Sequence, residues 1–370
     1  MTTGPALVGL SCATPVLSAA PNSPPFRRSV AEPLRLLVLG GTRYLGPAVV
    51  RSALGRGHEV TLFNRGKTQS WLFRGLEKLN GNRFPEVGKG LSALQGRHWE
   101  VIVDTSGQYP RVVDASTALL QHRSAHYIMV SSISAYASFK AVGLDEGSPL
   151  RALGREYSEN PDLVEGDWPT YGARKSLGEA TVAQRFEGRH TIVRPGPICG
   201  GDNNDGTGAY WAERLFRDTS VLVPGRGEDP LQLIDVRDAA DFIILAAEQR
   251  LQGAFNLVGP ETAITVADYM AACRAAVGGR GEIVWAGDFP QELGNMPLIV
   301  PFHIAPGHAT VRNTRAVAAG LRFRPLADTI LSDWIDHRSR RGHLHDFSAD
   351  GLGVPAAREA ELIAAQLDRG

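Results

Sequence analysis

The feature that most constrains the fold is a strand–loop–helix–strand pattern within residues 34–63. The apolar run 34–39 ends in glycine and predicts a buried strand, and apolar residues from 45 to 54 recur at helical spacing. Residues 60–63 predict a second strand directly afterwards. A unit of this kind, about 30 residues long, builds parallel sheets through right-handed crossovers. The sequence therefore predicts an α/β protein.

The same alternation continues along the chain. Further strands are predicted at 101–104, 127–131 and 191–194, and helices at 111–122 and 170–186. Strands that alternate with helices indicate a doubly wound parallel sheet, the Rossmann arrangement, which we assign to residues 31–197. Within it, residues 139–168 are rich in Gly, Pro, Asp, Glu and Ser and predict a substrate-binding insert.

A smaller substrate-binding lobe, interwoven with the first domain, is predicted for residues 198–345. Its predicted elements are helices at 209–217, 236–248 and 266–277 and a strand at 254–258. The C-terminal segment 346–370 contains one amphipathic helix, at 355–367. Residues 1–30 are predicted to be a disordered leader. No Lys or Arg precedes their apolar part, which disfavours an export signal.

Charge and cysteine content exclude several classes of protein. The 39 basic and 39 acidic residues cancel, so we expect no nucleic-acid partner, and a hydrophobic content of 43% excludes global disorder. The apolar stretch 6–20 is too short and too interrupted to span a bilayer. Three widely spaced cysteines give neither a metal-ligand spacing nor a disulfide framework. A cytoplasmic protein without a metal site is the expectation.

A glycine-rich loop joins the first predicted strand to the first helix. In this position the free N–H groups of the helix N-terminus can bind a pyrophosphate. The expected cofactor contacts are Gly40, Thr42, Arg43, Tyr44, Leu45 and Gly46. The usual spacing would place a further glycine where this chain has Arg43, near the phosphates.

The end of the second predicted strand bears on the choice of cofactor. A carboxylate there binds the ribose 2′-hydroxyl of NAD, whereas arginine suits a 2′-phosphate. This chain has Asn64 followed by Arg65, with Lys67 nearby. NADP(H) is therefore the preferred cofactor and NAD(H) the alternative. Arg65 could equally lie on a solvated strand end without binding a phosphate.

Tyr171 and Lys175 are four residues apart on a predicted helix and so share one face. A free tyrosine has a pKa near 10 and is a poor proton donor or acceptor at neutral pH. We expect the neighbouring ammonium to lower the pKa of Tyr171 toward the working range. The pair is typical of a catalytic tyrosine with a lysine that also holds the cofactor ribose.

Polar residues in three further places are candidates for substrate contacts. The segment 130–136, which includes Ser132, ends a predicted strand, and a serine hydroxyl there can bond a substrate oxygen, although serines at strand ends also make plain turns. The other candidates are Ser134, Asn203, Asn204, Tyr210, Trp211, Gln232 and Asp235. An ordinary polar loop with a packed aromatic pair explains the later residues equally well.

Together these segments resemble the extended and atypical branch of the short-chain dehydrogenase/reductase superfamily, of the NAD-dependent epimerase/dehydratase type. The resemblance covers residues 33–335 and includes Arg194-Pro195-Gly196 and the segment 234–238. It implies that Tyr171 is the general acid/base, that Lys175 binds ribose, and that Ser132 polarises the reacting oxygen. It also implies cofactor contacts from Asn82, Thr105, Ser106, Gly107, Pro195 and Gly196. The insert before Tyr171 is longer than in sugar-nucleotide epimerases.

The expected function is hydride transfer between a nicotinamide and a carbinol or carbonyl carbon of a small polar or sugar-like substrate. The net outcome is either reduction or epimerisation. A homodimer is an expectation from the resemblance alone. The alternative is a non-catalytic dinucleotide-binding protein with an RNA-binding or regulatory role, because some atypical members bind RNA in chloroplasts. The arginines at 338, 340 and 341 are compatible with that alternative.

Overall fold

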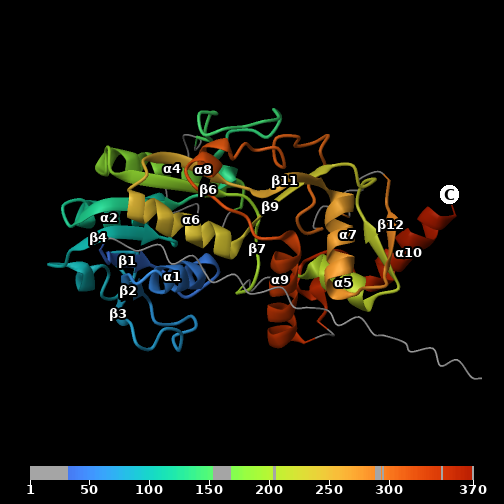
Figure 1. Ribbon diagram of the computed structural model, residues 1–370, viewed down its shortest axis with the longest axis horizontal. Coiled ribbons are helices and arrows are strands. Elements are labelled where there is room, and N and C mark those ends of the chain that lie inside the picture. The colour runs from blue at the N-terminus through green and yellow to red at the C-terminus, as the bar shows by residue number, and fades with distance from the viewer. Residues whose placement is uncertain are drawn as a thin grey trace, which may run out of the picture.

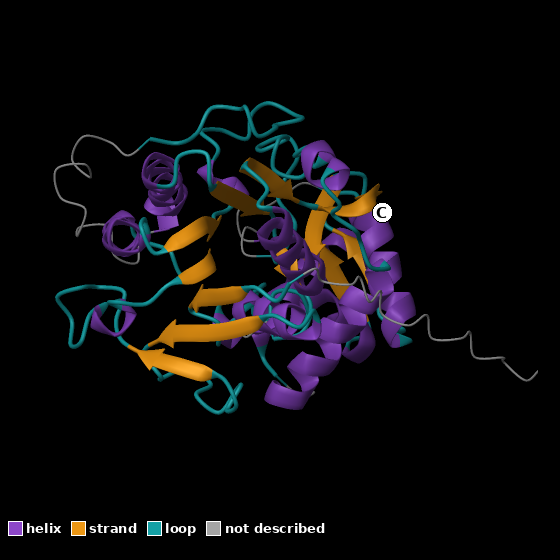
Figure 2. Cartoon of the chain, turned by 60° about the vertical axis from the view of Figure 1, so that its left-hand side comes forward, coloured by secondary structure: helices purple, strands orange, loops and turns teal. Residues whose placement is uncertain are grey.

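Seven parallel strands form the main sheet of the protein in the computed structural model, which describes residues 32–152, 168–202, 206–287, 293, 296–342 and 345–368. The strand order is β10-β6-β5-β4-β1-β2-β3. The strands are β1 (Arg35–Leu39), β2 (Glu59–Asn64), β3 (Glu77–Asn80), β4 (Trp99–Asp104), β5 (Ser124–Val130), β6 (His190–Pro195) and β10 (Gly253–Leu257). Figure 2 shows them in succession with helices on either side.

The sheet is covered on both faces because its central strands are apolar throughout. On β1, Leu36 and Val38 point to one face and Leu37 and Leu39 to the other, and all four are fully buried. Helices α1 (Leu45–Gly55) and α6 (Val236–Gln249) cover the first face, and α2 (Pro110–Leu120) and α4 (Trp168–Arg185) cover the second. The result is a three-layer α/β/α sandwich (Figure 1).

The strand order reverses direction at β1. The chain passes from β1 to β2 on one side, and β4 lies on the other side of β1. The loops that follow β1 and β4 therefore diverge at their carboxyl ends. In doubly wound sheets, ligands bind in the crevice that opens at this point.

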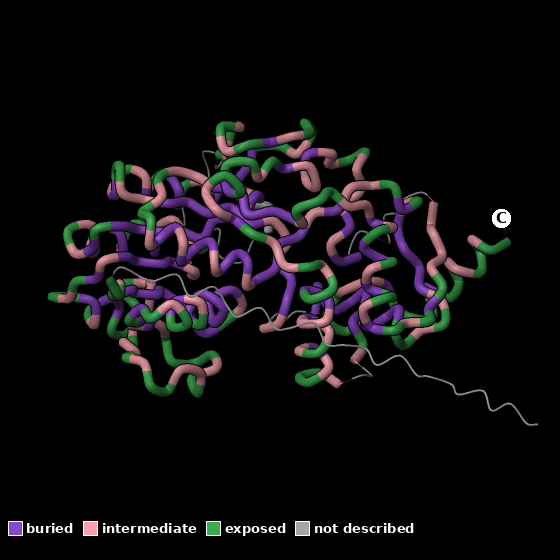
Figure 3. The backbone as a smooth tube through the Cα atoms, in the orientation of Figure 1, coloured by how far each residue is buried: buried purple, intermediate pink, exposed green. Residues whose placement is uncertain are grey.

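The smaller lobe has its own sheets and its own core. One sheet contains β7 (Ile198–Cys199), β9 (Pro230–Asp235) and β11 (Gly259–Thr265), and the other pairs β8 (Ser220–Val223) with β12 (Glu282–Trp285). Its helices are α5 (Tyr210–Arg217), α7 (Val266–Val277), α9 (Leu326–Arg341) and α10 (Ala356–Leu367). Buried residues continue through both halves of the molecule in Figure 3.

The predicted fold class is confirmed, but the division between lobes differs from the expectation in one respect. The sequence assigned the helix near 236–248 and the strand near 254–258 to the smaller lobe. Instead, α6 packs on α1, and β10 pairs with β6 at the edge of the main sheet. Helix α8 (Thr314–Ala318) packs beside β10. The smaller lobe is therefore inserted into the main α/β fold as well as following it.

Two further outcomes concern the predicted elements. The strand β3 was not predicted, because its sequence Glu-Lys-Leu-Asn is short and mostly polar, as at a sheet edge. The C-terminal helix is present as α10.

The expected leader lies outside the described residues, as do residues 153–167 of the insert. Among the described helices, none has the length and apolar character needed to cross a membrane.

Candidate active site

The glycine-rich loop is packed so tightly that side chains cannot be added to it. Gly40 has a φ of +113°, and a Cβ there would lie 2.5 Å from the Thr105 hydroxyl oxygen. A Cβ at Gly46 would lie 2.8 Å from the Cα of Gly41. The loop therefore lets α1 begin directly against the end of β1. This is the close backbone approach that a pyrophosphate site requires.

Other residues of the loop have distinct roles. Tyr44 is the N-cap of α1, with a φ of 56° and no side-chain cap, so the first amides of the helix are not capped by its side chain. Its hydroxyl donates to the carbonyl of Ile198 at 3.1 Å and so joins the loop to the smaller lobe. Thr42 and Leu45 are buried. Arg43 is exposed, so its side chain does not fill the loop.

At the end of β2, Asn64 fastens two backbone segments. Its Nδ2 donates to the Gly40 carbonyl at 3.2 Å, and its Oδ1 accepts from the Gly66 amide at 2.9 Å. Arg65 and Lys67 are exposed, and no described residue forms an ion pair with either. Two exposed cations thus follow the strand end that Asn64 fastens to the glycine loop.

The turn after β4 joins this loop to the rest of the site. Thr105 and Ser106 donate their hydroxyl hydrogens to the Leu39 carbonyl at 3.1 and 2.9 Å. Gly107 follows and is buried. Asn82 stabilises a neighbouring turn, since its Oδ1 accepts from the Phe84 amide at 3.1 Å. The predicted contacts at 105–107 therefore lie against the end of β1, whereas the side-chain oxygen of Asn82 is already engaged.

The three predicted catalytic residues come together. Ser132 lies two residues after β5 and caps the short 3-10 helix η2 (Ile133–Ala135), and its side chain forms a hydrogen bond with that of Tyr171. Lys175, on the same face of α4, has its Nζ 5.8 Å from the Tyr171 ring centroid. That ammonium donates to the carbonyls of Gly107 and Val130, both at 2.9 Å.

The pKa of Tyr171 differs from the expectation, and the pKa of Lys175 is shifted from its ordinary value. Burial raises the pKa of Tyr171, while the hydrogen bond with Ser132 and the Arg174 charge oppose that rise. The prediction that the phenol pKa is lowered is therefore wrong for the protein without cofactor. Burial also lowers the pKa of Lys175 to about 8, against the opposing charges of Asp104 and Glu179.

A buried network beneath the site was missed by the sequence analysis. Ser131 donates its hydroxyl hydrogen to Glu179, which forms an ion pair with Arg194 at 2.6 Å, both side chains 5% exposed. Arg194 also donates to the Tyr136 hydroxyl at 3.3 Å. The Gly196 amide donates to the Leu257 carbonyl at 3.0 Å, so the segment containing Pro195 is held at the sheet edge. The only sequence signal for this network was the spacing of Glu179 four residues after Lys175.

Most of the predicted substrate contacts have structural roles instead. Tyr210 and Trp211 are 1% and 0% exposed in the core of the smaller lobe, and the Tyr210 hydroxyl accepts from Arg214 at 2.9 Å. Gln232 makes two bonds of 3.0 Å with the backbone of Val311. Asp235 is the N-cap of α6. A substrate role for these four is not supported, because packing or backbone contacts already engage them.

The remaining candidates have different outcomes. Ser134 lies in η2 beside Ser132, and its amide donates to the Ser132 hydroxyl oxygen at 3.1 Å. Asn203 and Asn204 lie outside the described residues. Within the part of the chain that the structure describes, no group of three His, Cys, Asp or Glu side chains is arranged to hold a metal ion.

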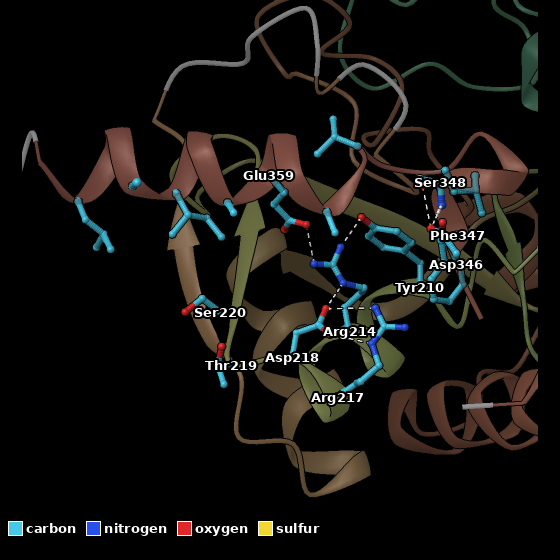
Figure 4. A pocket seen from close by; sticks show the side chains of 17 residues that line it. Tyr210, Arg214, Arg217, Asp218, Thr219, Ser220, Asp346, Phe347, Ser348 and Glu359 are labelled. Atoms are coloured by element: carbon cyan, nitrogen blue, oxygen red, sulfur yellow. Dashed lines mark hydrogen bonds and ion pairs between the residues drawn. The ribbon is translucent and has the colours of Figure 1, made fainter. Parts of the chain in front are cut away.

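A cavity of about 430 Å³ lies elsewhere, between α5, α10 and the segment around the 3-10 helix η5 (Phe347–Asp350) of the smaller lobe. Figure 4 shows Arg214 at its wall, bonded to Glu359, Tyr210 and Asp218. None of the predicted catalytic residues lines this cavity. It is separate from the crevice beside β1.

The fold and the arrangement of Tyr171, Lys175 and Ser132 are those expected of an extended short-chain dehydrogenase/reductase of the NAD-dependent epimerase type. No family model matches the chain. Comparison with curated proteins and solved structures confirms the resemblance. The relatives are distant, and their sequences match only part of the chain.

Among the curated relatives, the chloroplast stem-loop binding protein of 41 kDa b of Arabidopsis thaliana is 24% identical over 68% of this chain. The match spans 65% of that protein's length, somewhat less than two thirds. The epimerase family protein SDR39U1 of Mus musculus is 27% identical over 66% of this chain and 81% of its own.

Among solved structures, the Bordetella bronchiseptica enzyme WbmG in complex with NAD matches with a TM-score of 0.63 and 16% identity. The match covers 85% of this chain and 97% of that one. WbmG has also been solved with NAD and UDP, with the same TM-score. These structures establish the fold.

Proposed function

We propose that the protein is an NAD(P)(H)-dependent oxidoreductase or epimerase of the extended short-chain dehydrogenase type. The observation that carries this proposal is the contact of Ser132 with Tyr171, with the buried Lys175 one turn along the same helix face. Three side chains, from the segment after β5 and from α4, thus meet at the carboxyl edge of the sheet, beside the glycine loop. A non-catalytic binding protein has no need of a phenol held in this way.

The described residues fit a dinucleotide. The loop at Gly40 and Gly46 leaves a cradle in which a Cβ would collide with Thr105 or with Gly41. The first amides of α1 and its positive dipole end favour an anionic pyrophosphate there. The residues proposed to hold the cofactor are Gly40, Thr42, Tyr44, Leu45, Gly46, Thr105, Ser106, Gly107, Lys175, Pro195 and Gly196. Arg43 and Asn82 are proposed at its edges.

Each catalytic side chain has one proposed task. Tyr171 exchanges a proton with the substrate oxygen, and Ser132 donates a hydrogen bond that orients the same oxygen. Lys175 binds the cofactor ribose and supplies a positive charge near the phenol when the site is filled. A bound nicotinamide supplies the hydride chemistry. Because the phenol pKa is raised in the protein alone, Tyr171 is in its protonated form at neutral pH before the cofactor binds.

We propose NADP(H) as the preferred cofactor, with NAD(H) as the alternative. Arg65 and Lys67 are exposed cations at the end of β2, and the amide of Asn64 replaces the carboxylate that would bind an unmodified ribose. A 2′-phosphate suits this charge better than a hydroxyl does. The solved WbmG complexes contain NAD, which supports the alternative.

The proposed substrate is a small polar, sugar-like molecule, and a sugar nucleotide is the leading class. WbmG binds UDP in a structure of the same fold, and the mouse relative is described as an epimerase family protein. Either net reduction or epimerisation fits the same three side chains. Cys199 and Cys273 are free and buried, so we also propose a cytoplasmic location. A homodimer stays a prediction from the resemblance.

The test is turnover of the Tyr171→Phe variant with NADPH or NAD and a panel of UDP-sugars. We expect turnover to fall by about 100-fold or more, because the proton donor is lost, while cofactor affinity changes little. The matched control is Tyr269→Phe, a fully buried tyrosine of the smaller lobe. Unchanged turnover in Tyr171→Phe would contradict the mechanism.

A second function is favoured by one observation, the similarity to the chloroplast stem-loop binding protein. In that case the protein would bind RNA and use the dinucleotide site for regulation. A stem-loop RNA titrated against the wild type, with and without NADPH, distinguishes the two. Tight binding that depends on NADPH, with no turnover of any UDP-sugar, would favour this function.

A further inference from the structure

Asp104 is a buried carboxylate that has no task in the proposed mechanism. It ends β4 and is 0% exposed. Its two oxygens accept from Arg83 at 2.6 and 2.8 Å, from the Tyr127 hydroxyl at 2.7 Å and from the Ser106 amide at 2.9 Å. Burial alone would raise the pKa of Asp104, but the Arg83 charge and these bonds lower it. The carboxylate is therefore ionised at neutral pH.

Asp104 shapes the turn that presents a carbonyl to Lys175. The bond from the Ser106 amide back to Asp104 closes this turn. Gly107 then rests on the carboxylate, since a Cβ there would lie 2.9 Å from the Asp104 Oδ2. The carbonyl of the same Gly107 accepts from the Lys175 ammonium at 2.9 Å. Movement of the carboxylate would therefore be transmitted directly to the lysine.

The same turn is also tied to the glycine loop. Ser106 donates its hydroxyl hydrogen to the Leu39 carbonyl at 2.9 Å, directly before Gly40. Arg83 donates to the Ser106 hydroxyl oxygen at 2.8 Å and to the Ser116 hydroxyl oxygen at 3.0 Å. One ion pair thus braces the lysine, the glycine loop and α2 together.

Five charged or titratable groups face Lys175. Asp104 and Arg83 lie on the sheet side, Arg174 and Glu179 lie on its own helix, and Tyr171 lies one turn before it. The two carboxylates favour the charged lysine and the two arginines oppose it, and the effect of Asp104 exceeds that of Arg83. Glu179 is already paired with Arg194 and acts on Ser131 rather than on the Gly107 turn.

We infer that Asp104, clamped by Arg83, is a positioning residue that holds the Lys175 ammonium in its cofactor-binding orientation and keeps it charged. It acts through the Gly107 carbonyl and through its own charge, and touches neither substrate nor cofactor. This inference rests on the proposed function, because it takes Lys175 to be the lysine that binds the cofactor ribose.

The experiment measures NADPH affinity from pH 7 to pH 10 by fluorescence, with NADH in parallel, on the full-length chain. The 2′-phosphate of NADPH is already ionised throughout this range, having a second pKa of about 6. Wild-type affinity is expected to fall as Lys175 loses its proton. The variants are Asp104→Asn, Arg83→Gln and Tyr127→Phe, with Lys175→Met as the reference that has no ammonium.

The two charge variants are expected to shift the midpoint of this fall in opposite directions. Asp104→Asn moves it to lower pH by about half a unit or more, because a favourable charge is lost. Arg83→Gln moves it to higher pH, because an opposing charge is lost. Tyr127→Phe removes a neutral hydrogen bond from the same carboxylate and moves the midpoint less than either. General destabilisation would not produce shifts of opposite sign.

Several results would overturn the inference. They are an unmoved midpoint in Asp104→Asn, shifts of the same sign in both charge variants, or a midpoint that persists in Lys175→Met. If Asp104→Asn does not fold, the test rests on Arg83→Gln. The pH midpoint of NADPH affinity must then move upward in Arg83→Gln, and an unmoved midpoint overturns the inference. Failure of the wild type to bind either nucleotide would instead overturn the proposed function itself.

Discussion

Gly172 of helix α4 lies so close to the backbone carbonyl of Ser134 that a Cβ at this glycine would be 1.9 Å from that oxygen. The obstruction is backbone, which cannot rotate out of the way as a side chain can. This contact sets the distance between α4, which carries Tyr171 and Lys175, and η2, which follows Ser132. The close packing of α4 on η2 therefore explains why a glycine stands next to Tyr171.

Replacing Gly172 with alanine is expected to force α4 and η2 apart. Overpacking of this kind costs about 1–3 kcal/mol in the free energy of unfolding, and the gain of up to about 1 kcal/mol in helix propensity offsets only part of it. Separation of Ser132 from Tyr171 should also lower turnover. Urea unfolding and activity assays measure both effects.

Gly178→Ala, on the same helix, is the matched control. A Cβ there would lie 2.6 Å from the Cε of Met129, the far end of a flexible side chain that can move aside. We expect a smaller loss of stability and unchanged contact between Ser132 and Tyr171. Equal losses in the two variants would contradict the role assigned to the Gly172 contact.

The stability of the cofactor-free protein should depend on pH through Lys175. Burial lowers the pKa of Lys175 from 10.5 to about 8, so between these values the unfolded chain binds more protons than the folded one. The free energy of unfolding therefore rises with pH across this window. Relative to Lys175→Met, the free energy of unfolding of the wild type, measured with urea, is expected to rise by up to about 3 kcal/mol across this pH window. A difference that is flat or falls with pH would show that the lysine is not titrating this way.

Cofactor choice can be tested at Arg65. If this side chain binds a 2′-phosphate, Arg65→Ala should weaken NADPH by about tenfold or more and leave NADH nearly unchanged. The control is Arg97→Ala, a half-buried arginine paired with Glu77 at the amino end of β3. Titration calorimetry with both nucleotides provides the measurement. Equal loss for NADPH and NADH, or no loss, would indicate NAD as the cofactor.

Helix α10 is anchored by a buried charge. Glu359, 3% exposed, accepts from Arg214 at 2.6 Å and from the Leu222 amide at 3.0 Å. Glu359→Ala is expected to cost about 3 kcal/mol, since it leaves Arg214 with one buried partner fewer. Hydrogen exchange should increase in α10, while NADPH affinity stays the same because the cavity there is separate from the crevice.

Glu361→Ala provides the comparison for that variant. Glu361 pairs with Arg358 on the exposed side of α10, and its side chain is 65% exposed. Such surface pairs contribute about 0–1 kcal/mol, so little change is expected. If Glu359→Ala abolished NADPH binding without unfolding the protein, the assignment of the site to the crevice would be wrong.

Local patterns in the sequence were sufficient for the first strand–helix–strand unit of the main sheet. The buried strand before Gly40 and the helical spacing after it are determined by neighbours along the chain. The placement of β10 could not be predicted from local patterns. Its pairing with β6 joins residues about sixty positions apart, and nothing in the sequence Gly-Ala-Phe-Asn-Leu specifies the edge of the main sheet. Position in a sheet depends on the whole topology.

Site residues could be predicted from the sequence where helix periodicity places them together, and could not be predicted where their role depends on how deeply they are buried. Tyr171 and Lys175 share a face because of their spacing, whereas Ser132 was identified through the family resemblance, since a serine near a strand end is not distinctive by itself. Tyr210 was wrongly predicted to contact substrate, because an aromatic residue in a hydrophobic core cannot be distinguished by sequence from one in a binding site. Arg83 and Asp104 are twenty-one residues apart and meet only in the folded chain, at 2.6 Å.

The return of β10 to the main sheet affects how the chain could be divided. A truncation after β6 would remove the edge strand and α6, exposing the apolar side of α1 to water. Isolating the half that contains the main sheet therefore requires excising the segment from 198 to 235 and rejoining its ends, rather than a single cut. During synthesis, likewise, that half of the molecule cannot close its own sheet until the ribosome has passed Leu257.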